Sequence, residues 1–147
     1  VPKANQKSAV HLVEQLGGTY HGEGLEKLAA LQPDIVIECT GAAPVIANVM
    51  CKNAASAIVC LTGLSSGVHR IRQDLNELNR TMVLENDVVF GTVNANRLHY
   101  EMAAEALAQA DQHWLRSLIT RRVPLRDWQQ AMERRDGDIK VVIDFTL

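Results

Sequence analysis

The sequence predicts an α/β protein, namely an incomplete doubly wound parallel sheet followed by a C-terminal helix-strand extension. Short, continuous apolar runs alternate with segments of helical periodicity, which is typical of parallel strands covered by helices on both faces. The chain has 147 residues and is 47% hydrophobic, enough to build a core of domain size. Residues 1–7 resemble a loop that leads into a helix, so we expect the opening strands of the sheet to be missing from this chain.

The predicted strands are apolar runs bounded by turn-forming residues. Glu38 is the one polar residue that interrupts the first run before its end, and Thr40 and Gly41 close that run. A brief additional strand is predicted at Thr19 and Tyr20. The four main strands are expected over residues 34–39, 57–61, 88–91 and 139–145.

The predicted helices carry apolar residues at helical spacing and end at glycine or proline. Gly17 and Gly18 stop the first helix, and Pro33 stops the second. The helices are expected over residues 8–16, 25–31, 43–52, 75–84, 98–110, 114–119 and 125–135. Because the alternation of strand and helix closes near Ala110, we expect one domain over residues 1–110 and an extension over residues 111–147.

Composition argues against several classes of protein. The net charge is −2 with both signs interspersed, so no cationic surface for nucleic acid is expected. Every apolar run is far shorter than the roughly 20 residues of a membrane helix, so we expect no membrane partner and a cytoplasmic location. Cys39, Cys51 and Cys60 lie in or beside apolar segments, which favours buried, reduced thiols.

No motif for metal binding, hydrolysis or phosphate binding is present. The five histidines are scattered without metal-ligand spacing, and neither a nucleophile elbow nor a Walker loop occurs. The pairs Arg121 with Arg122 and Arg134 with Arg135 are expected to lie on a solvated face. Lys3 could meet a ribose 2′-phosphate, although a solvated surface lysine is the simpler interpretation.

Candidate binding residues lie where the predicted strands end, because open parallel sheets bind ligands at the carboxyl ends of their strands. These ends are Thr40 with Gly41, residues 62–66 and residues 92–96. Such residue types also end strands in proteins without a ligand, because they suit turns and helix caps. Asn96 is expected to cap the following helix, whereas Asn94 lies farther from it and keeps its amide available for a ligand.

Five segments together resemble the glucose dehydrogenases of the medium-chain, zinc-dependent type. The most specific is VVFGTVNANR, in which the family usually has Ser or Thr before Val and Asn. DIVIECTG alone would be shared by most nicotinamide-binding folds of the superfamily. The segments are DIVIECTG from Asp34, CLTGLSSG from Cys60, NRTMVLENDVVFGTVNANRLHYE from Asn79, LITRRVPL from Leu118 and DIKVVIDF from Asp138.

The resemblance implies an incomplete Rossmann-like domain that binds NADP or NAD, with residues 111–147 returning towards an absent catalytic domain. It implies that Thr62, Gly63 and Leu64 lie beside the nicotinamide through backbone groups. It also implies that Thr92, Val93 and Asn94 line the cofactor and that Asn94 reaches a hydroxyl of the sugar substrate. No catalytic residue and no metal ligand is expected here, since the zinc ligands of the family lie in its catalytic domain.

The function predicted from this resemblance is that of a C-terminal part of a glucose (aldose) 1-dehydrogenase. Such enzymes transfer hydride from C1 of a pyranose to NAD(P)+. The glycine-rich phosphate turn is absent, so we expect the isolated chain to be inactive. Because the missing opening strands would expose a sheet edge, we expect the chain to be held by a partner, by substituted strand pairing or by self-association, with a homo-oligomer favoured. Two alternatives stay open: a noncatalytic, dimerising Rossmann-like module, and another medium-chain alcohol or polyol dehydrogenase.

Overall fold

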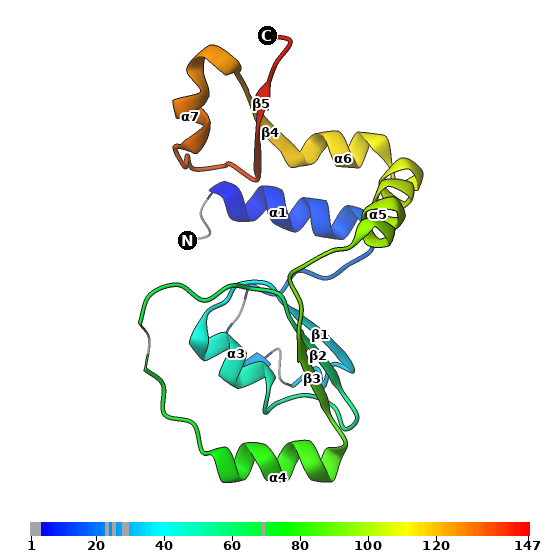
Figure 1. The fold of residues 1–147 in the computed structure, drawn as a ribbon, viewed down its shortest axis with the longest axis vertical. Coiled ribbons are helices and arrows are strands. Elements are labelled where there is room, and N and C mark those ends of the chain that lie inside the picture. The colour runs from blue at the N-terminus through cyan, green and yellow to red at the C-terminus, as the bar shows by residue number, and fades with distance from the viewer. Residues whose placement is uncertain (1–3, 23, 25, 28–29, 69) are drawn as a thin grey trace. The chain divides into compact units, whose positions relative to one another are not determined.

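The computed structural model describes residues 4–22, 24, 26–27, 30–68 and 70–147. The chain divides into two compact units, one of residues 21–94 and the other of residues 1–20 with residues 95–147 (Figure 1). Parallel strands with helical crossovers occur in both. The predicted α/β class is therefore confirmed.

The unit of residues 21–94 is built on a three-stranded parallel sheet. Its strands are β1 (Ile35–Glu38), β2 (Ile58–Leu61) and β3 (Val88–Gly91), in the spatial order β1-β2-β3. These are three of the predicted strands, within a residue or two of the expected bounds. Their last residues, Glu38, Leu61 and Gly91, are register partners, so all three strands end at the same edge.

Two helices connect these strands. Helix α3 (Ala43–Val49) joins β1 to β2 and packs against β1, and helix α4 (Leu75–Glu85) precedes β3. Asp74 caps α4 by accepting hydrogen bonds from the backbone N–H groups of Asn76 and Glu77. These connecting segments make each parallel pairing possible, because a parallel strand can be reached only by a crossover.

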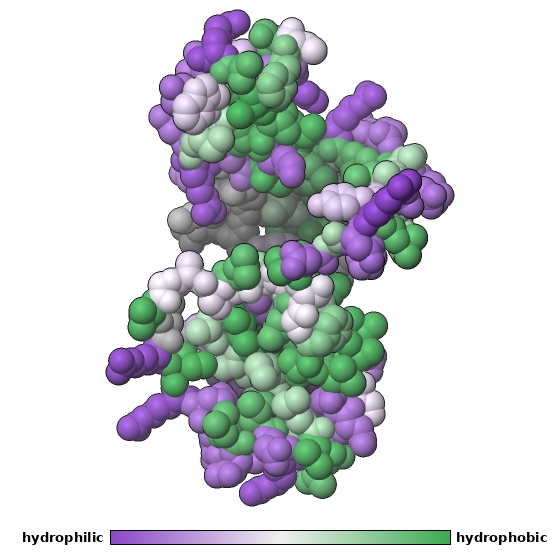
Figure 2. All heavy atoms as spheres, viewed as in Figure 1, coloured by the Kyte–Doolittle hydropathy of each residue, from purple (hydrophilic) through white to green (hydrophobic). Residues whose placement is uncertain are grey.

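The core of this unit lies on one face of the sheet. Val59 at the centre of β2 is completely buried, whereas Ile35 and Ile37 on the opposite face are 66% and 65% exposed. Figure 2 shows hydrophobic residues gathered over the strands of this unit. The sequence predicted a sheet with helices covering both faces. The described residues of this unit bury only one face of the sheet.

The described residues of the second unit form four helices, a 3₁₀ turn and a two-stranded parallel sheet. The helices are α1 (Ala4–Gln15), α5 (Arg97–Gln109), α6 (Gln112–Leu118) and α7 (Trp128–Met132), and the turn is η1 (Leu125–Asp127). The indole Nε1 of Trp114 on α6 donates a hydrogen bond of 2.9 Å to the carbonyl oxygen of Leu12 on α1. This bond joins segments 102 residues apart in sequence.

The sheet of this unit pairs the predicted last strand with one that the sequence did not predict. Strand β4 (Ile119–Pro124) runs parallel to β5 (Lys140–Asp144), with η1 and α7 forming the crossover. The sequence prediction assigns no strand to residues 120–124, where two adjacent arginines interrupt the apolar pattern. Parallel pairing with β5 is a long-range interaction that local pattern does not reveal.

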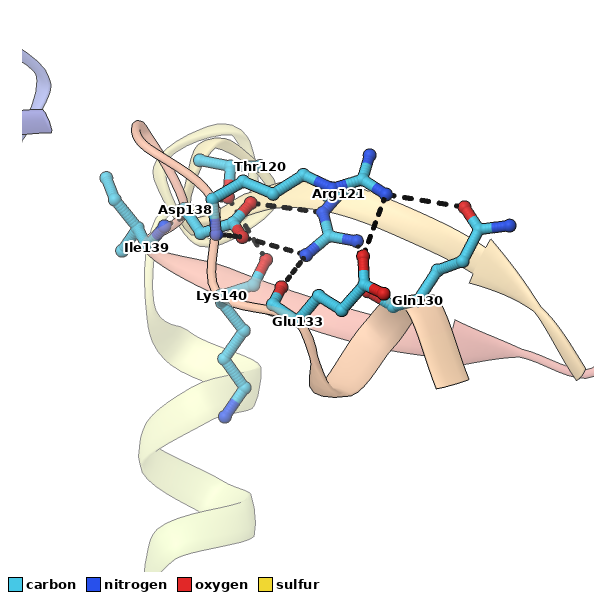
Figure 3. Close-up of polar contacts among 8 residues, drawn as sticks. Thr120, Arg121, Gln130, Glu133, Asp138, Ile139 and Lys140 are labelled. Carbon is cyan, nitrogen blue, oxygen red and sulfur yellow. Dashed lines mark hydrogen bonds and ion pairs between the residues drawn. The ribbon is translucent and has the colours of Figure 1, made fainter. Parts of the chain in front are cut away.

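The contacts of Arg121 explain why β4 can contain a half-buried arginine. Its side chain is only 15% exposed and forms an ion pair with Asp138, with Nη2 2.8 Å from Oδ2 (Figure 3). The same guanidinium donates to the carbonyl oxygens of Gln130, at 2.6 Å, and Glu133, at 2.7 Å, at the end of α7. The expectation of a solvated Arg121 is therefore wrong, whereas the Arg122 side chain is 52% exposed as a surface residue would be.

The structure differs from the sequence prediction at two further places. Thr19 and Tyr20 form no strand, since neither pairs with another of the described segments. Cys39 is exposed and Cys51 and Cys60 are half-buried, so the thiols are free but less buried than expected. The helix predicted over residues 25–31 includes residues 25, 28 and 29, and Lys3 precedes the first helix; these positions lie outside the described residues.

Candidate functional site at the strand tips

The common edge of the sheet brings three loop segments together. Because Glu38, Leu61 and Gly91 are in register, the residues after β1, β2 and β3 leave the sheet at one level. Thr62 stays close to β1 through its backbone N–H, which donates to the carbonyl oxygen of Glu38 at 2.8 Å. The backbone N–H of Thr92 likewise donates to Leu61 at 3.0 Å. The strand tips thus form one continuous surface.

A pocket of about 490 Å³ opens at this surface. It contains all six residues for which the sequence predicted cofactor contacts, with Gly63 and Val93 lining the same hollow. Leu64 is 78% and Val93 67% exposed, so the pocket is open to a ligand from outside. Its lining residues are Leu61, Thr62, Gly63, Leu64, Gly91, Thr92, Val93 and Asn94.

The pocket offers polar groups that the chain itself does not use. Among the described residues, none accepts a hydrogen bond from the backbone N–H of Leu64 or Val93, and none bonds the side-chain amide of Asn94. Backbone N–H groups and an amide can together bind a carboxamide and a hydroxyl group. The arrangement suits a flat, polar ligand laid across the strand tips.

Asn96 has the structural role that the sequence predicted. Its side-chain oxygen accepts a hydrogen bond of 3.0 Å from the backbone N–H of His99, and the Nδ1 atom of His99 accepts one of 3.3 Å from the backbone N–H of Asn96. This reciprocal capping box starts helix α5. Two asparagines that are two residues apart therefore differ in role, since Asn96 is committed to the helix and Asn94 lines the pocket.

Glu38, which the sequence singled out only as a break in an apolar run, is a buried residue that contacts the loops after β1 and β2. Its side chain is 3% exposed. The carboxylate accepts hydrogen bonds from the backbone N–H of Thr40 at 2.7 Å, from the Thr40 hydroxyl, and from the backbone N–H of Gly41 at 3.1 Å. A buried carboxylate needs such donors because removing it from water is costly.

The electrostatics of Glu38 follow from these contacts. The hydrogen bond from the Thr40 hydroxyl lowers the pKa of the Glu38 carboxyl below its ordinary value, and the backbone N–H groups of Thr40 and Gly41 act in the same direction. Burial opposes them by raising the pKa, but the hydrogen bonds win. Glu38 is therefore ionised at neutral pH and acts as a fixed acceptor.

Two glycines let the loops after β1 and β2 interlock. A Cβ atom on Gly63 would lie 2.1 Å from the backbone nitrogen of Gly41 and 2.8 Å from Oε2 of Glu38. A Cβ atom on Gly41 would lie 2.4 Å from the carbonyl oxygen of Leu64, and Gly41 has a φ of +66° that favours glycine. Any larger residue at either position would push the two loops apart.

Within the described ranges, no group of three or more His, Cys, Asp or Glu side chains is placed to hold a metal ion. The helices in those same ranges include none with the length and apolar character needed to cross a membrane.

The fold and the strand-tip pocket define the class of protein first. A solved alcohol dehydrogenase from Thermotoga maritima matches 90% of this chain with a TM-score of 0.73 at 19% identity, a likeness of fold. Glucose dehydrogenase from Haloferax mediterranei, solved in complex with NADP, Zn and gluconolactone, matches 94% of the chain with a TM-score of 0.85 at 26% identity. The fold is the Rossmann-like C-terminal domain of medium-chain dehydrogenases.

The family follows from the sequence comparisons. The chain belongs to the family described as glucose dehydrogenase C-terminus, whose model matches residues 2–145. It is 35% identical over 136 residues to glucose 1-dehydrogenase 2 of Vulcanisaeta moutnovskia, covering 90% of this chain and 38% of that protein. It is 32% identical over 127 residues to glucose 1-dehydrogenase of Methanocella arvoryzae, covering 82% and 35%. The chain thus spans little more than a third of these two relatives' length, and 40% of the Haloferax chain.

Proposed function

We propose that this chain is the cofactor-binding, C-terminal part of a glucose (aldose) 1-dehydrogenase that oxidises C1 of a pyranose with NAD(P)+. The observation that carries the proposal is the strand-tip pocket. Six residues from two separate segments, predicted to meet a cofactor, line a single hollow in a chain of this family. The likeness to the Haloferax enzyme with NADP and gluconolactone supports the same ligands here.

In this proposal the floor of the pocket holds the nicotinamide through backbone groups. Thr62, Gly63 and Leu64 lie along one side, and Thr92 and Val93 along the other. Because Gly41 and Gly63 carry no side chain, the loops after β1 and β2 pack closely and leave backbone atoms at the base of the pocket. A flat ring can lie on such a surface. When bound, the nicotinamide supplies the acceptor for the hydride that leaves C1 of the sugar.

Asn94 has a second proposed role at the edge of the pocket. Its amide carries both a donor and an acceptor and is not used by the described residues. We assign it a hydrogen bond to a sugar hydroxyl, which would orient C1 towards the cofactor. The zinc of such enzymes would be held by residues outside this chain, consistent with the zinc in the Haloferax complex. Either NAD or NADP remains compatible with the pocket.

We propose the wider organisation on the same basis. Residues 1–110 would contribute to the cofactor domain, and residues 111–147 would return towards a catalytic domain supplied by the rest of the protein. The isolated chain would then lack turnover of its own. A homo-oligomer and a cytoplasmic location stay predictions from the sequence.

The test uses the complete product of the gene that encodes this chain. Glucose oxidation is followed by the absorbance of reduced nicotinamide, with NAD+ and NADP+ in separate assays and with other aldoses and polyols as competing substrates. Glucose-dependent reduction of either cofactor is expected. Activity with an alcohol or polyol in place of glucose would favour another medium-chain dehydrogenase.

A binding measurement separates the remaining alternative. Calorimetric titration of NAD+ and NADP+ into the complete protein is expected to give saturable binding. If neither cofactor binds to a folded protein, the enzyme assignment fails and the noncatalytic Rossmann-like module becomes the better description.

A further inference from the structure

We propose that Glu38 is a positioning residue that holds the loops after β1 and β2 in the one arrangement that forms the nicotinamide floor. This inference rests on the proposed function and deepens it. Glu38 itself is not among the residues that line the pocket. It would act through Gly63 and Leu64, which are.

The backbone of Glu38 holds the loop after β2. Its carbonyl oxygen accepts three hydrogen bonds from the loop after β2: from the backbone N–H of Thr62 at 2.8 Å, from the Thr62 hydroxyl at 2.9 Å, and from the backbone N–H of Gly63 at 3.0 Å. Three donors on one carbonyl fix the direction in which that loop leaves the sheet. The start of the pocket floor is therefore tied to Glu38.

The side chain of Glu38 holds the loop after β1. The carboxylate turns back and gathers the backbone N–H groups of Thr40 and Gly41, so it determines the shape of the loop after β1. Oε2 of Glu38 is also close to Gly63, since a Cβ atom built there would lie 2.8 Å away. One residue thus organises its own loop with its side chain and the neighbouring loop with its backbone.

The loops after β1 and β2 are in direct contact, so a shift of one moves the other. Gly41 lies directly against the carbonyl of Leu64, where a Cβ atom would approach the oxygen to 2.4 Å. If the loop after β1 lost its carboxylate anchor, Gly41 would shift, and Leu64 would have to follow because no free space separates them. A displacement of that kind would tilt the surface on which the ring lies.

Charge makes the role specific to a carboxylate. No ion pair involves Glu38 among the described residues, and its donors are backbone N–H groups and one hydroxyl. A glutamine of nearly the same shape can keep its oxygen at the place of Oε1, which accepts from Thr40 and Gly41, but its NH₂ group then replaces Oε2 against the N–H of Gly41. It also loses the negative charge that strengthens all of these hydrogen bonds. If Glu38 served only to fill space, the exchange for glutamine would have little effect. If Glu38 holds the loop as a charged acceptor, the exchange should loosen it.

The experiment compares Glu38→Gln with the wild type in the complete gene product. We expect the Kd for NAD+ or NADP+, whichever the wild type uses, to rise about tenfold, because the loop geometry is loosened. The primary deuterium isotope effect with glucose deuterated at C1 should increase, since hydride transfer becomes more rate-limiting. The KM for glucose should change much less. Glu105→Gln, an exposed glutamate on α5, is the matched control and should leave all three quantities unchanged.

A second pair of variants covers the case in which Glu38→Gln does not fold. Thr40→Val removes the hydroxyl donor to Glu38, and Thr40→Ser restores one. Weaker cofactor binding in Thr40→Val, with recovery in Thr40→Ser, supports the positioning role.

The outcomes separate this inference from the proposed function. A wild-type protein that neither binds NAD(P)+ nor oxidises glucose removes the function itself. An active wild type, with cofactor Kd and isotope effect unchanged in folded Glu38→Gln or in Thr40→Val, overturns the positioning role alone.

Discussion

Arg121 and Asp138 form a two-pronged ion pair, with Nε 3.1 Å from Oδ1 and Nη2 2.8 Å from Oδ2. The two side chains are 15% and 12% exposed. The pairing raises the pKa of Arg121 and lowers that of Asp138, in each case chiefly through the hydrogen bonds between them. The pair joins strand β4 to the turn before β5, so it stabilises the parallel pairing of these two strands.

The first prediction concerns this pair. Arg121→Lys keeps the charge but loses the fork that reaches Asp138 and two carbonyl oxygens, so it should lower the Tm of the complete protein by about 2 °C. Differential scanning calorimetry is the measurement. Arg122→Ala, which removes a more exposed arginine, is the control and should shift the Tm by much less. Equal shifts in both variants would show that the fork adds nothing.

The second prediction concerns Asn94. Replacing it with alanine removes the amide that faces the pocket, so kcat/KM for glucose should fall by the equivalent of about 1 to 3 kcal/mol. Steady-state kinetics on the complete protein test this. Asn79→Ala, on the exposed surface of α4, should behave as wild type. Unchanged kinetics in Asn94→Ala would remove this residue from the site.

The third prediction concerns Gly63. Alanine at this position would bring Cβ to 2.1 Å from the backbone nitrogen of Gly41, an impossible contact, so one loop must move. We expect Gly63→Ala to weaken NAD(P)+ binding more than tenfold and to lower stability, as calorimetric titration and thermal unfolding would measure. Gly24→Ala, where a Cβ meets no atom within 4 Å, should be tolerated. Wild-type binding in Gly63→Ala would contradict the close packing of the two loops.

The fourth prediction is a pH dependence. The pKa of Glu38 is lowered in the folded state from its ordinary 4.5, so the folded carboxyl binds its proton less readily than the unfolded one. Its contribution to stability is therefore complete above about pH 4.5 and is lost as the pH falls through the folded pKa. Urea unfolding of the complete protein between neutral and acidic pH should show this loss. Glu38→Gln should lose less stability over the same range, and parallel profiles would contradict the prediction.

Local pattern was enough to predict most elements of the fold. The runs that became β1, β2 and β3 are apolar and bounded by turn residues. Helices α4 and α5, which follow β2 and β3, start at the capping side chains of Asp74 and Asn96. Strand β4 was not predictable in this way. Its two arginines interrupt the apolar pattern, and its strand geometry depends on pairing with β5.

The sequence indicated which residues line the candidate site, but not the contacts that hold them in place. The family resemblance indicated Gly63 and Val93, and the tertiary structure places both at one pocket. Glu38 was overlooked because a single carboxylate in an apolar run gives no sign of what it binds. Its partners, Thr62 and Gly63, are more than twenty residues away, so only folding brings them together.

The sequence by itself determined the class of fold, the family resemblance and the residues at the strand ends, because these depend on local periodicity, turn chemistry and short motifs. The tertiary structure alone decided that the strands end in register and that Gly41 and Gly63 interlock. It also decided that Glu38 is a buried acceptor and that Arg121 is a half-buried donor. These are relationships between segments distant in the chain. Their energies arise from close packing and from hydrogen bonds shielded from water, and neither exists before the chain has folded.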